Sequence, residues 1–287
     1  MMGYGDSLIT LSLLERAGAA AQGIRVVGTG VTAAVAALLR SPVPLSQQLF
    51  GDVAAFYVVR ERGALRAAAD FARFRRWSRG LGADDTLVFE KADWRHRWLV
   101  PPGRCRVLQV PRASTAYADR ERLLRPWLGE QPWPRSPAPN GVARRLLINP
   151  SARASARELG RPLLDEALRL AAEAGAEVCL LDPQGRHAGL KAQVQSYLHG
   201  APLGEAAAAL RESDRYLGPD SFFMHLAYYY GKPQLALFHP HNMYFLPPGL
   251  DQSGEYLHFA QAQGAPLQAA LRRLLGLPIA AGAGAAA

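Results

Sequence analysis

Cysteine is scarce in this sequence, where Cys105 and Cys179 are the two among 287 residues. They lie far apart in strand-like sequence, which favours buried thiols in a reducing compartment over a disulfide or a metal pair. No apolar run approaches the roughly 18 residues that a membrane span requires. The first residues, MMGYGDSLIT, lack the basic region and apolar stretch of a signal peptide. These absences argue against a disulfide-stapled secreted domain and a membrane span, and they predict a globular protein.

Acidic residues are also in deficit, with 24 Asp and Glu against 33 Lys and Arg, a net charge of +9. Nearly all the basic residues are arginines. Residues 1–140 carry 20 basic and 12 acidic residues, a net of +8, whereas residues 141–287 carry 13 and 12, a net of +1. The first half is therefore expected to meet an anionic partner: nucleic acid, a phosphorylated sugar or an anionic membrane face. Arginine enrichment through high-GC codon usage is the alternative.

What the chain does contain is two blocks in which apolar runs alternate with helical patterns, as is typical of α/β units with parallel sheets. The first block predicts strands at 24–30, 53–59, 85–90 and 105–110, and helices at 7–21, 31–40 and 64–80. The second block predicts strands at 144–150, 176–183, 215–219 and 233–240, and helices at 161–175, 187–198, 204–212, 221–230 and 265–276.

A Pro-rich stretch between the blocks, LGEQPWPRSPAPNG at 128–141, predicts a linker. Parallel sheets bind ligands beyond the carboxyl ends of their strands, so the loops of both domains are expected to face a cleft. The low-complexity tail AAGAGAAA is expected to fray. The predicted parts are a domain at 1–130, a linker at 131–141, a second domain at 142–264, a helix at 265–277 and a disordered tail at 278–287.

The segment GPDSFFMHLAYYYGKP predicts a helix over 221–230. Asp220 is a favoured N-cap, and Gly231 is the expected residue just past the helix end. The free N–H groups and the dipole at the start of this helix favour an anion. Asp220 and Ser221 also suit a ribose or a phosphate. Plain capping by Asp220 is the alternative.

A second candidate loop follows the predicted strand at 144–150. It carries Asn149, Ser151, Arg153 and Arg157. Polar and cationic groups between a strand and a helix suit a phosphate, and each arginine can neutralise a diphosphate oxygen. A solvated loop with two surface arginines is the alternative.

Two further groups of polar residues lie next to predicted elements, one at a helix start and one at a strand end. Gly5, Asp6 and Ser7 precede an apolar helical stretch, where Asp6 suits either a general base for a hydroxyl or an N-cap. His239 and His241 follow the predicted strand at 233–240. Two histidines can bind a metal, but no third ligand with suitable spacing is apparent, so no metal site is predicted.

Three of these loops together resemble one protein family, the ADP-heptose:lipopolysaccharide heptosyltransferases of glycosyltransferase family 9. GDSLITL at 5–11 is similar to the family's G-D-x-x-x-T-L start, and NPSARASAR at 149–157 to its P-G-x-G-x-x-x-K-R-W loop. DSFFMHLA at 220–227, GKP at 231–233 and ALF at 236–238 resemble its D-[ST]-G-x-x-H-L-A, G-K-P and A-L-F-G-P segments. The matches follow the family's order over most of the chain, and the last is the most specific.

The resemblance implies an α/β fold of the GT-B type, with two Rossmann-like domains and their parallel sheets facing a cleft. It implies inverting, metal-independent transfer of a heptose-like sugar from a nucleotide donor, usually an ADP-sugar, to a lipid-linked core glycan. The absence of a D-x-D sequence agrees with metal independence. Localisation would be cytoplasmic, with peripheral contact at the inner membrane surface, and no nucleic acid or cofactor is implied.

The resemblance also implies roles for individual residues. Asp6 matches the proposed general base. The donor would be bound by Asn149, Ser151, Arg153, Arg157, Asp220, Ser221, Phe222, His225, His239 and His241. The anionic acceptor would contact Gly5 and Ser7. Arg95 and Arg97 of DWRHRWL are further acceptor candidates, chosen for their charge.

The sequence departs from the family pattern in four places. The family's first strand has no counterpart before the Gly-Asp loop. Phe222 replaces a glycine, and a bulky ring there is expected to hinder a phosphate. Arg157 replaces a lysine and Leu159 a tryptophan. The loop after the strand at 233–240 carries His239-Pro240-His241 where the family has G-P-T.

These departures keep other functions open. One alternative is a non-catalytic sugar-nucleotide or glycan-binding protein with a degenerate site. Another is a GT-B sugar-nucleotide epimerase, which uses the same cleft without an acceptor. Nucleic-acid binding ranks last, because the arginine-rich stretches RFRRWSRG and DWRHRWL match no known module.

Overall fold

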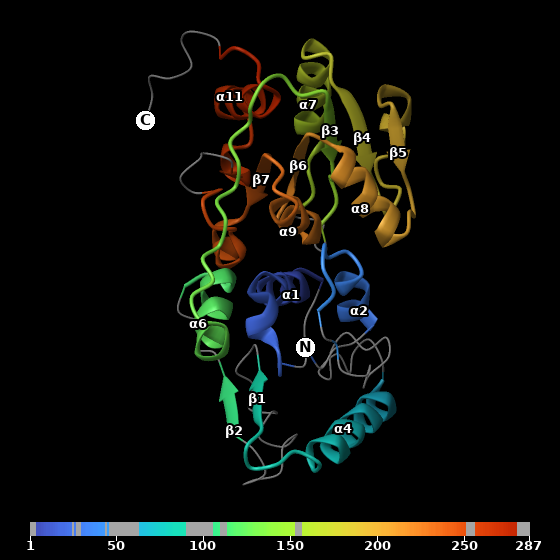
Figure 1. The fold of residues 1–287 in the computed structure, drawn as a ribbon. Helices are drawn as coiled ribbons and strands as arrows, with labels where there is room; N and C mark the ends of the chain where they lie inside the picture. Colours follow the sequence, from blue (N-terminus) through green and yellow to red (C-terminus); the bar gives the residue numbers. More distant parts are fainter. Residues whose placement is uncertain are drawn as a thin grey trace. The chain divides into compact units, whose positions relative to one another are not determined.

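The computed structural model describes residues 4–24, 26, 30–43, 45, 63–89, 106–109, 114–152, 157–250 and 256–279. The chain divides into two compact units, Met1–Pro132 and Trp133–Ala287 (Figure 1). The predicted strand at 53–59, Cys105, and the tail from residue 280 onward lie outside the described residues. In the described part of the chain, no helix combines the length and apolar character that a membrane crossing demands.

The first unit is built around one buried helix. Helix α1 (Tyr4–Ala17) is buried on all sides from Ser7 to Leu14, which is the pattern of a central helix. It packs against α2 and α6. Strands β1 and β2 pair in parallel, with Thr86 opposite Arg106, and Val26 forms an isolated parallel bridge to Leu45. The other elements are the 3-10 helix η1 (Gly18–Ala21), α2 (Gly30–Ala36), α4 (Ala64–Ser78), β1 (Thr86–Phe89), β2 (Arg106–Gln109) and α6 (Ala116–Leu128).

Helix α6 was not expected from the sequence. It begins with a capped turn, in which the Thr115 hydroxyl accepts a hydrogen bond from the Ala118 N–H at 3.2 Å. Pro126 lies in its last turn, and a proline within a helical pattern usually predicts that the helix is interrupted. Packing against α1 stabilises this helix regardless of that local signal.

The second unit contains a six-stranded parallel sheet in the order β5-β4-β3-β6-β7-β8. The chain starts in the middle at β3, fills one side, and then crosses to β6 on the other side of β3. This is the strand order of a Rossmann-type sheet. All strands are parallel, but the side on which the chain adds the next strand switches between β3 and β6. The strands are β3 (Arg145–Ile148), β4 (Glu177–Leu181), β5 (Ser196–Leu198), β6 (Arg215–Pro219), β7 (Gln234–Phe238) and β8 (Tyr256–His258).

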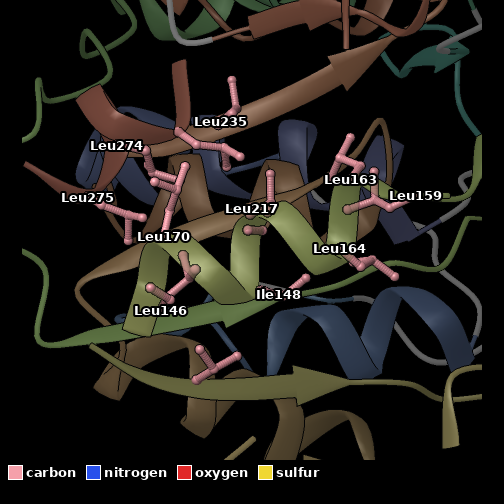
Figure 2. Close-up of a cluster of buried hydrophobic side chains, with 14 of the residues drawn as sticks. Leu146, Ile148, Leu159, Leu163, Leu164, Leu170, Leu217, Leu235, Leu274 and Leu275 are labelled. Atoms are coloured by element: carbon pink, nitrogen blue, oxygen red, sulfur yellow. The ribbon is translucent and has the colours of Figure 1, made fainter. Parts of the chain in front are cut away.

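Helices cover both faces of this sheet. Alternate strand residues face α7 and α11 and form a leucine-rich core with them, including Leu146, Leu217 and Leu235 (Figure 2). The residues between them face the other way, where α8 contacts β3 and α9 contacts β6 and β7. The helices are α7 (Arg161–Glu173), α8 (Leu203–Glu212), α9 (Phe222–Tyr229) and α11 (Gly264–Leu275), with the 3-10 helices η3 (Ala188–Gln193), η4 (Pro240–Phe245) and η5 (Phe259–Gln261).

The predicted helix at 187–198 is wrong. The segment forms η3 and then the edge strand β5, whose Ser196 pairs with Cys179 of β4. Pairing with a neighbouring strand outweighs a weak local helical pattern. The predicted glycine ends are confirmed: Gly175 and Gly231 follow α7 and α9 with φ of +68° and +67°.

The Pro-rich segment predicted as a linker is bound along the second unit. The Tyr228 hydroxyl donates to the Pro134 carbonyl. Arg215 donates to the Asn140 carbonyl at 2.7 Å, and Gly249 packs against Arg135. These contacts hold residues 134–140 against the unit whose strand β3 they precede.

Candidate functional site

The predicted donor-binding residues gather at one edge of the six-stranded sheet. Strands β3, β6 and β7 are parallel neighbours, with Ile148 opposite Leu217 and Pro219 opposite Leu237. Polar residues directly follow each of these strands, so Asn149, Asp220 and His239 lie at the same carboxyl edge. This edge includes the point between β3 and β6 where the order of strand addition reverses, which is where open α/β sheets bind their ligands.

Asp220 is not the N-cap of α9, contrary to the expectation. The N-cap position is Ser221, whose side chain makes no capping hydrogen bond. Asp220 is buried instead, and its Oδ2 accepts a hydrogen bond from Arg157 Nη1 at 3.2 Å. The side chain of the N-cap residue therefore does not cap α9, whose first N–H groups face the carboxyl edge of the sheet.

Burial raises the pKa of Asp220 from its ordinary value of 3.8 to about 6, although Arg157 and, more weakly, His241 favour the charged form. The side chain of Asp220 is 6% exposed, whereas that of Arg157 is 24% exposed. The carboxylate is therefore enclosed, while the guanidinium still reaches solvent.

A hydroxyl and amide network lies beneath the start of α9. Asn149 Nδ2 donates to Ser221 Oγ at 3.2 Å and, in a longer contact of 3.5 Å, to the Tyr216 hydroxyl. The Tyr216 and Ser221 hydroxyls are 3.4 Å apart. Burial raises the pKa of Tyr216 to about 12, so this phenol stays neutral near pH 7. The network fixes Ser221 Oγ at the helix start.

Gly218 allows Tyr216 to reach this network. The two residues lie on the same face of β6, two positions apart. A Cβ on Gly218 would lie 2.2 Å from the Tyr216 hydroxyl and 2.6 Å from its Cζ. The tyrosine ring thus occupies the space above Gly218 and runs along the strand toward its carboxyl end. The sequence reasoning missed Tyr216, because nothing local marks a strand tyrosine as part of a site.

The loop after β3 adds one more polar group. Ser151 is buried, its N–H donates to Asn149 Oδ1 at 3.3 Å, and its Oγ has no hydrogen-bond partner among the described residues. Arg153 of the same loop lies outside the described residues. Asn149 therefore orients both Ser151 and Ser221.

Aromatic rings surround the site. His225 of α9 is buried, with its ring edge-on to Phe245 at 6.3 Å. His239 stacks between His241 and Phe259, at centroid distances of 5.3 Å and 4.7 Å. The described residues contain no group of three or more His, Cys, Asp or Glu side chains that could hold a metal ion.

Phe222, which replaces the family glycine, is half-buried. Its ring makes an edge contact with Phe223 at 5.3 Å. It therefore has an aromatic neighbour on the same helix, and its expected effect on phosphate binding stays a prediction.

A second buried carboxylate at the same edge, Asp182, was not predicted. Asp182 follows β4, is fully buried, and accepts hydrogen bonds from the His187 N–H at 2.7 Å and the Tyr197 hydroxyl at 2.8 Å. Its backbone carbonyl lies 3.3 Å from His199 Nδ1. Asp182 thereby holds the turn at 183–187. The sequence DPQG is the local signal of such a turn.

In the first unit, the candidate base Asp6 lies in the first turn of α1. Its Oδ1 accepts from Arg120 Nη2 of α6 at 3.2 Å. Arg120 was not predicted, because it lies 114 residues away in the sequence. Gly5 is half-buried and Ser7 is fully buried. The acceptor candidates Arg95 and Arg97 lie outside the described residues.

No model of a known protein family matches the chain, and no curated protein matches it either. Solved structures do match over most of its length. A glycosyl transferase of family 9 from Veillonella parvula is 15% identical with a TM-score of 0.64, and the alignment covers 90% of this chain and 83% of that one. The Escherichia coli heptosyltransferase WaaC with ADP is 15% identical with a TM-score of 0.61, covering 90% of each chain.

A third match is the Escherichia coli ADP-heptose lps heptosyltransferase II. It is 13% identical with a TM-score of 0.58, and the alignment covers 89% of this chain and 87% of that one. These matches, together with the parallel Rossmann-type sheet, confirm the predicted α/β fold class. The chain has the fold of these GT-B heptosyltransferases.

Proposed function

We propose that this protein is an inverting glycosyltransferase that moves a heptose-like sugar from a nucleotide donor, an ADP-sugar, to a hydroxyl of an anionic lipid-linked glycan. The observation that carries the proposal is the set of groups at the carboxyl edge of the six-stranded sheet. The start of α9, which its N-cap side chain does not cap, a partly exposed Arg157 and a positioned Ser221 hydroxyl meet there. The matching WaaC structures, described as containing ADP and ADP-2-deoxy-2-fluoro heptose, support a donor of this class.

The donor diphosphate would lie at the start of α9. The N–H groups of the helix and the guanidinium of Arg157 supply positive charge for the phosphate oxygens. The same groups would stabilise the negative charge that develops on the leaving diphosphate, so the proposed reaction requires no metal. Asn149 and Ser221 would orient the phosphate or the ribose through hydrogen bonds.

Asp6 is the proposed general base. It would take the proton of the acceptor hydroxyl as the oxygen bonds to the anomeric carbon. The bond from that carbon to the diphosphate breaks, its electron pair leaves with the diphosphate, and the configuration at the carbon inverts. Arg120 holds the Asp6 carboxylate through the ion pair at 3.2 Å and is therefore a positioning residue.

The charge of the first half supports an anionic acceptor at a membrane surface. Helix α4 presents Arg75 and Arg76 to solvent, followed by Arg79, and Leu65 on the same helix is 88% exposed. Basic side chains near an anionic bilayer contribute about 1 kcal/mol each. Arg75→Glu with Arg76→Glu is expected to weaken sedimentation with phosphatidylglycerol vesicles, whereas Arg161→Glu on α7 is the control.

A non-catalytic nucleotide-sugar or glycan-binding protein is the second candidate. Phe222 favours it, because an aromatic side chain occupies the first position of α9, where close approach of a phosphate is expected. In that case the protein would bind a nucleotide sugar and leave it intact. Release of nucleotide from the donor by pure protein with acceptor excludes this candidate.

Thermal unfolding with nucleotides is the first test. The protein is melted with ADP, UDP and GDP and the corresponding sugar nucleotides, beside Arg157→Ala. We expect a stabilisation that is selective for ADP compounds and is lost in the variant. A cooperative unfolding transition that no nucleotide shifts would contradict a donor site at this edge.

A further inference from the structure

Arg157 and Asp220 form an ion pair at the carboxyl edge of the sheet. Both residues were expected to bind the donor, yet in the described chain each is the other's ion-pair partner. The Arg157 guanidinium carries a single positive charge, which the Asp220 carboxylate balances in this ion pair. A phosphate arriving at the start of α9 therefore competes with Asp220 for this guanidinium.

We propose that ligand binding moves Arg157 from Asp220 to the phosphate, and that Asp220 takes up a proton as it does so. The proposal rests on the proposed function in one respect, that this edge binds a diphosphate. It adds that the site exchanges a proton with solvent each time the nucleotide enters or leaves.

The surroundings of Asp220 support this exchange. Arg157, from the loop after β3, is the ion-pair partner, and His241 of η4 also favours the charged form. Tyr216 of the same strand is neutral, with its pKa raised in part by Asp220. Once Arg157 turns to a phosphate, the buried carboxylate faces a new anion and has lost its ion-pair partner. Its charged form is then strongly disfavoured.

Solvent exposure decides which partner moves. Arg157 is the exposed member of the pair and its long side chain can swing, whereas Asp220 is fixed at the end of β6 by its N–H bond to Leu237 at 2.9 Å. A protonated Asp220 is a neutral hydrogen-bond donor, so it can bind a phosphate oxygen that its ionised form would repel. The proton returns to solvent when the nucleotide leaves.

The sign of the pH dependence follows from linkage. Without ligand, the pKa of Asp220 is about 6, and with a phosphate bound it is higher. The complex then binds more protons than the free protein at any pH between these two values. The affinity is expected to be constant below pH 6 and to fall above it, by up to about tenfold per pH unit.

The test is calorimetric titration with ADP-glucose, whose diphosphate does not titrate in the relevant range. Titrations at pH 5.5, 6.5, 7.5 and 8.5 are repeated in buffers of different ionisation enthalpy. We expect an affinity loss of several-fold or more between pH 6.5 and 8.5, and a buffer-dependent heat that corresponds to uptake of up to one proton.

Three variants identify the group. Asp220→Asn is expected to flatten the pH profile and abolish the buffer dependence. His241→Gln is expected to keep proton uptake at pH 7.5, which separates Asp220 from the neighbouring histidine. Glu158→Gln is the matched control, because this adjacent carboxylate pairs with Arg186 and is expected to leave the profile unchanged.

The outcomes separate this inference from the proposed function. Binding with no proton uptake, or parallel pH profiles of wild type and Asp220→Asn, overturns the exchange and leaves the nucleotide site intact. Failure of the folded protein to bind ADP-glucose at any pH overturns both. If Asp220→Asn does not fold, the wild-type buffer series beside His241→Gln still decides, because uptake that disappears in His241→Gln would assign the proton to the histidine.

Discussion

Each of the two units contains a candidate carboxylate that forms an ion pair with an arginine at 3.2 Å. The two pairs differ in which partner is the more exposed to solvent. In the second unit Asp220 is 6% exposed and Arg157 24%. In the first unit the order is reversed, with Asp6 at 11% and Arg120 at 1%. The outward member of one pair is a cation suited to a phosphate, and that of the other is a carboxylate suited to a hydroxyl proton. The function that an ion pair can serve therefore depends on which of its partners is accessible to solvent and ligands.

Replacing the arginines tests this difference most strongly. Arg120→Met removes the buried arginine of the first pair and is expected to cost about 3 to 5 kcal/mol of unfolding free energy. Arg157→Met is expected to cost only about 1 kcal/mol, because Asp220 takes a proton instead of remaining charged. Urea unfolding of both variants at pH 7 measures the difference. Equal losses would mean that exposure does not distinguish the two pairs.

Replacing the carboxylates tests the roles. Asp6→Asn keeps the shape and is expected to lower the transfer rate by about 10² to 10⁴-fold, with nucleotide affinity unchanged, because only the base is lost. Asp220→Asn is the counterpart and is expected to act on affinity and its pH dependence. The assays are turnover of donor with acceptor and binding of ADP. Wild-type turnover by Asp6→Asn would remove the base assignment.

Gly218→Ala perturbs the second unit alone. The new Cβ falls 2.2 Å from the Tyr216 hydroxyl, so overpacking is expected to cost about 1 to 3 kcal/mol and to displace Ser221. Adding Tyr216→Val is expected to recover most of the loss, as a double-mutant cycle would report. Gly204→Ala on α8, where a Cβ meets nothing within 4 Å, is the control. Additive effects of the first two changes would contradict the packing argument.

The smallest effect concerns stability against pH. The pKa of Asp220 is about 6 when folded and about 3.9 in an unfolded chain, so the folded protein binds the proton more tightly. Its contribution is favourable below about pH 4 and is lost as the pH rises through 6. Asp220→Asn is therefore expected to be more stable than wild type at pH 7.5, by about 1 to 2 kcal/mol, with the gap closing at pH 4. Unfolding curves at both pH values test it, and a gap independent of pH would contradict the shift.

Local signals predicted much of the second unit. Its long amphipathic helices and short buried strands lie where the apolar pattern indicated, and the glycines after α7 and α9 end those helices. Three elements were missed for physical reasons, two strands in this unit and one helix in the first unit. Strand β5 depends on pairing with β4, β8 has three residues and no usable period, and α6 contains a proline.

The position of the candidate site could be predicted from the sequence, but the hydrogen bonds and ion pairs between its residues could not. Polar residues after three strands marked the edge of the sheet, and the α/β alternation placed that edge on one side. The prediction that Asp220 caps α9 was wrong, because its buried carboxylate pairs with Arg157, which lies 63 residues earlier in the chain. Tyr216 and Asp182 were missed because their partners also come from other strands and loops.

The strand and helix alternation, the concentration of positive charge in the first half and the polar loops after the strands could all be predicted from the sequence alone. Periodicity, composition and turn chemistry are local properties, so they can be read along the chain. Only the tertiary structure decided that Arg157 pairs with Asp220, that Arg120 holds Asp6, and that Gly218 makes room for Tyr216. Each of these depends on burial and on the approach of atoms from separate segments, which set the charge state and reach of every group.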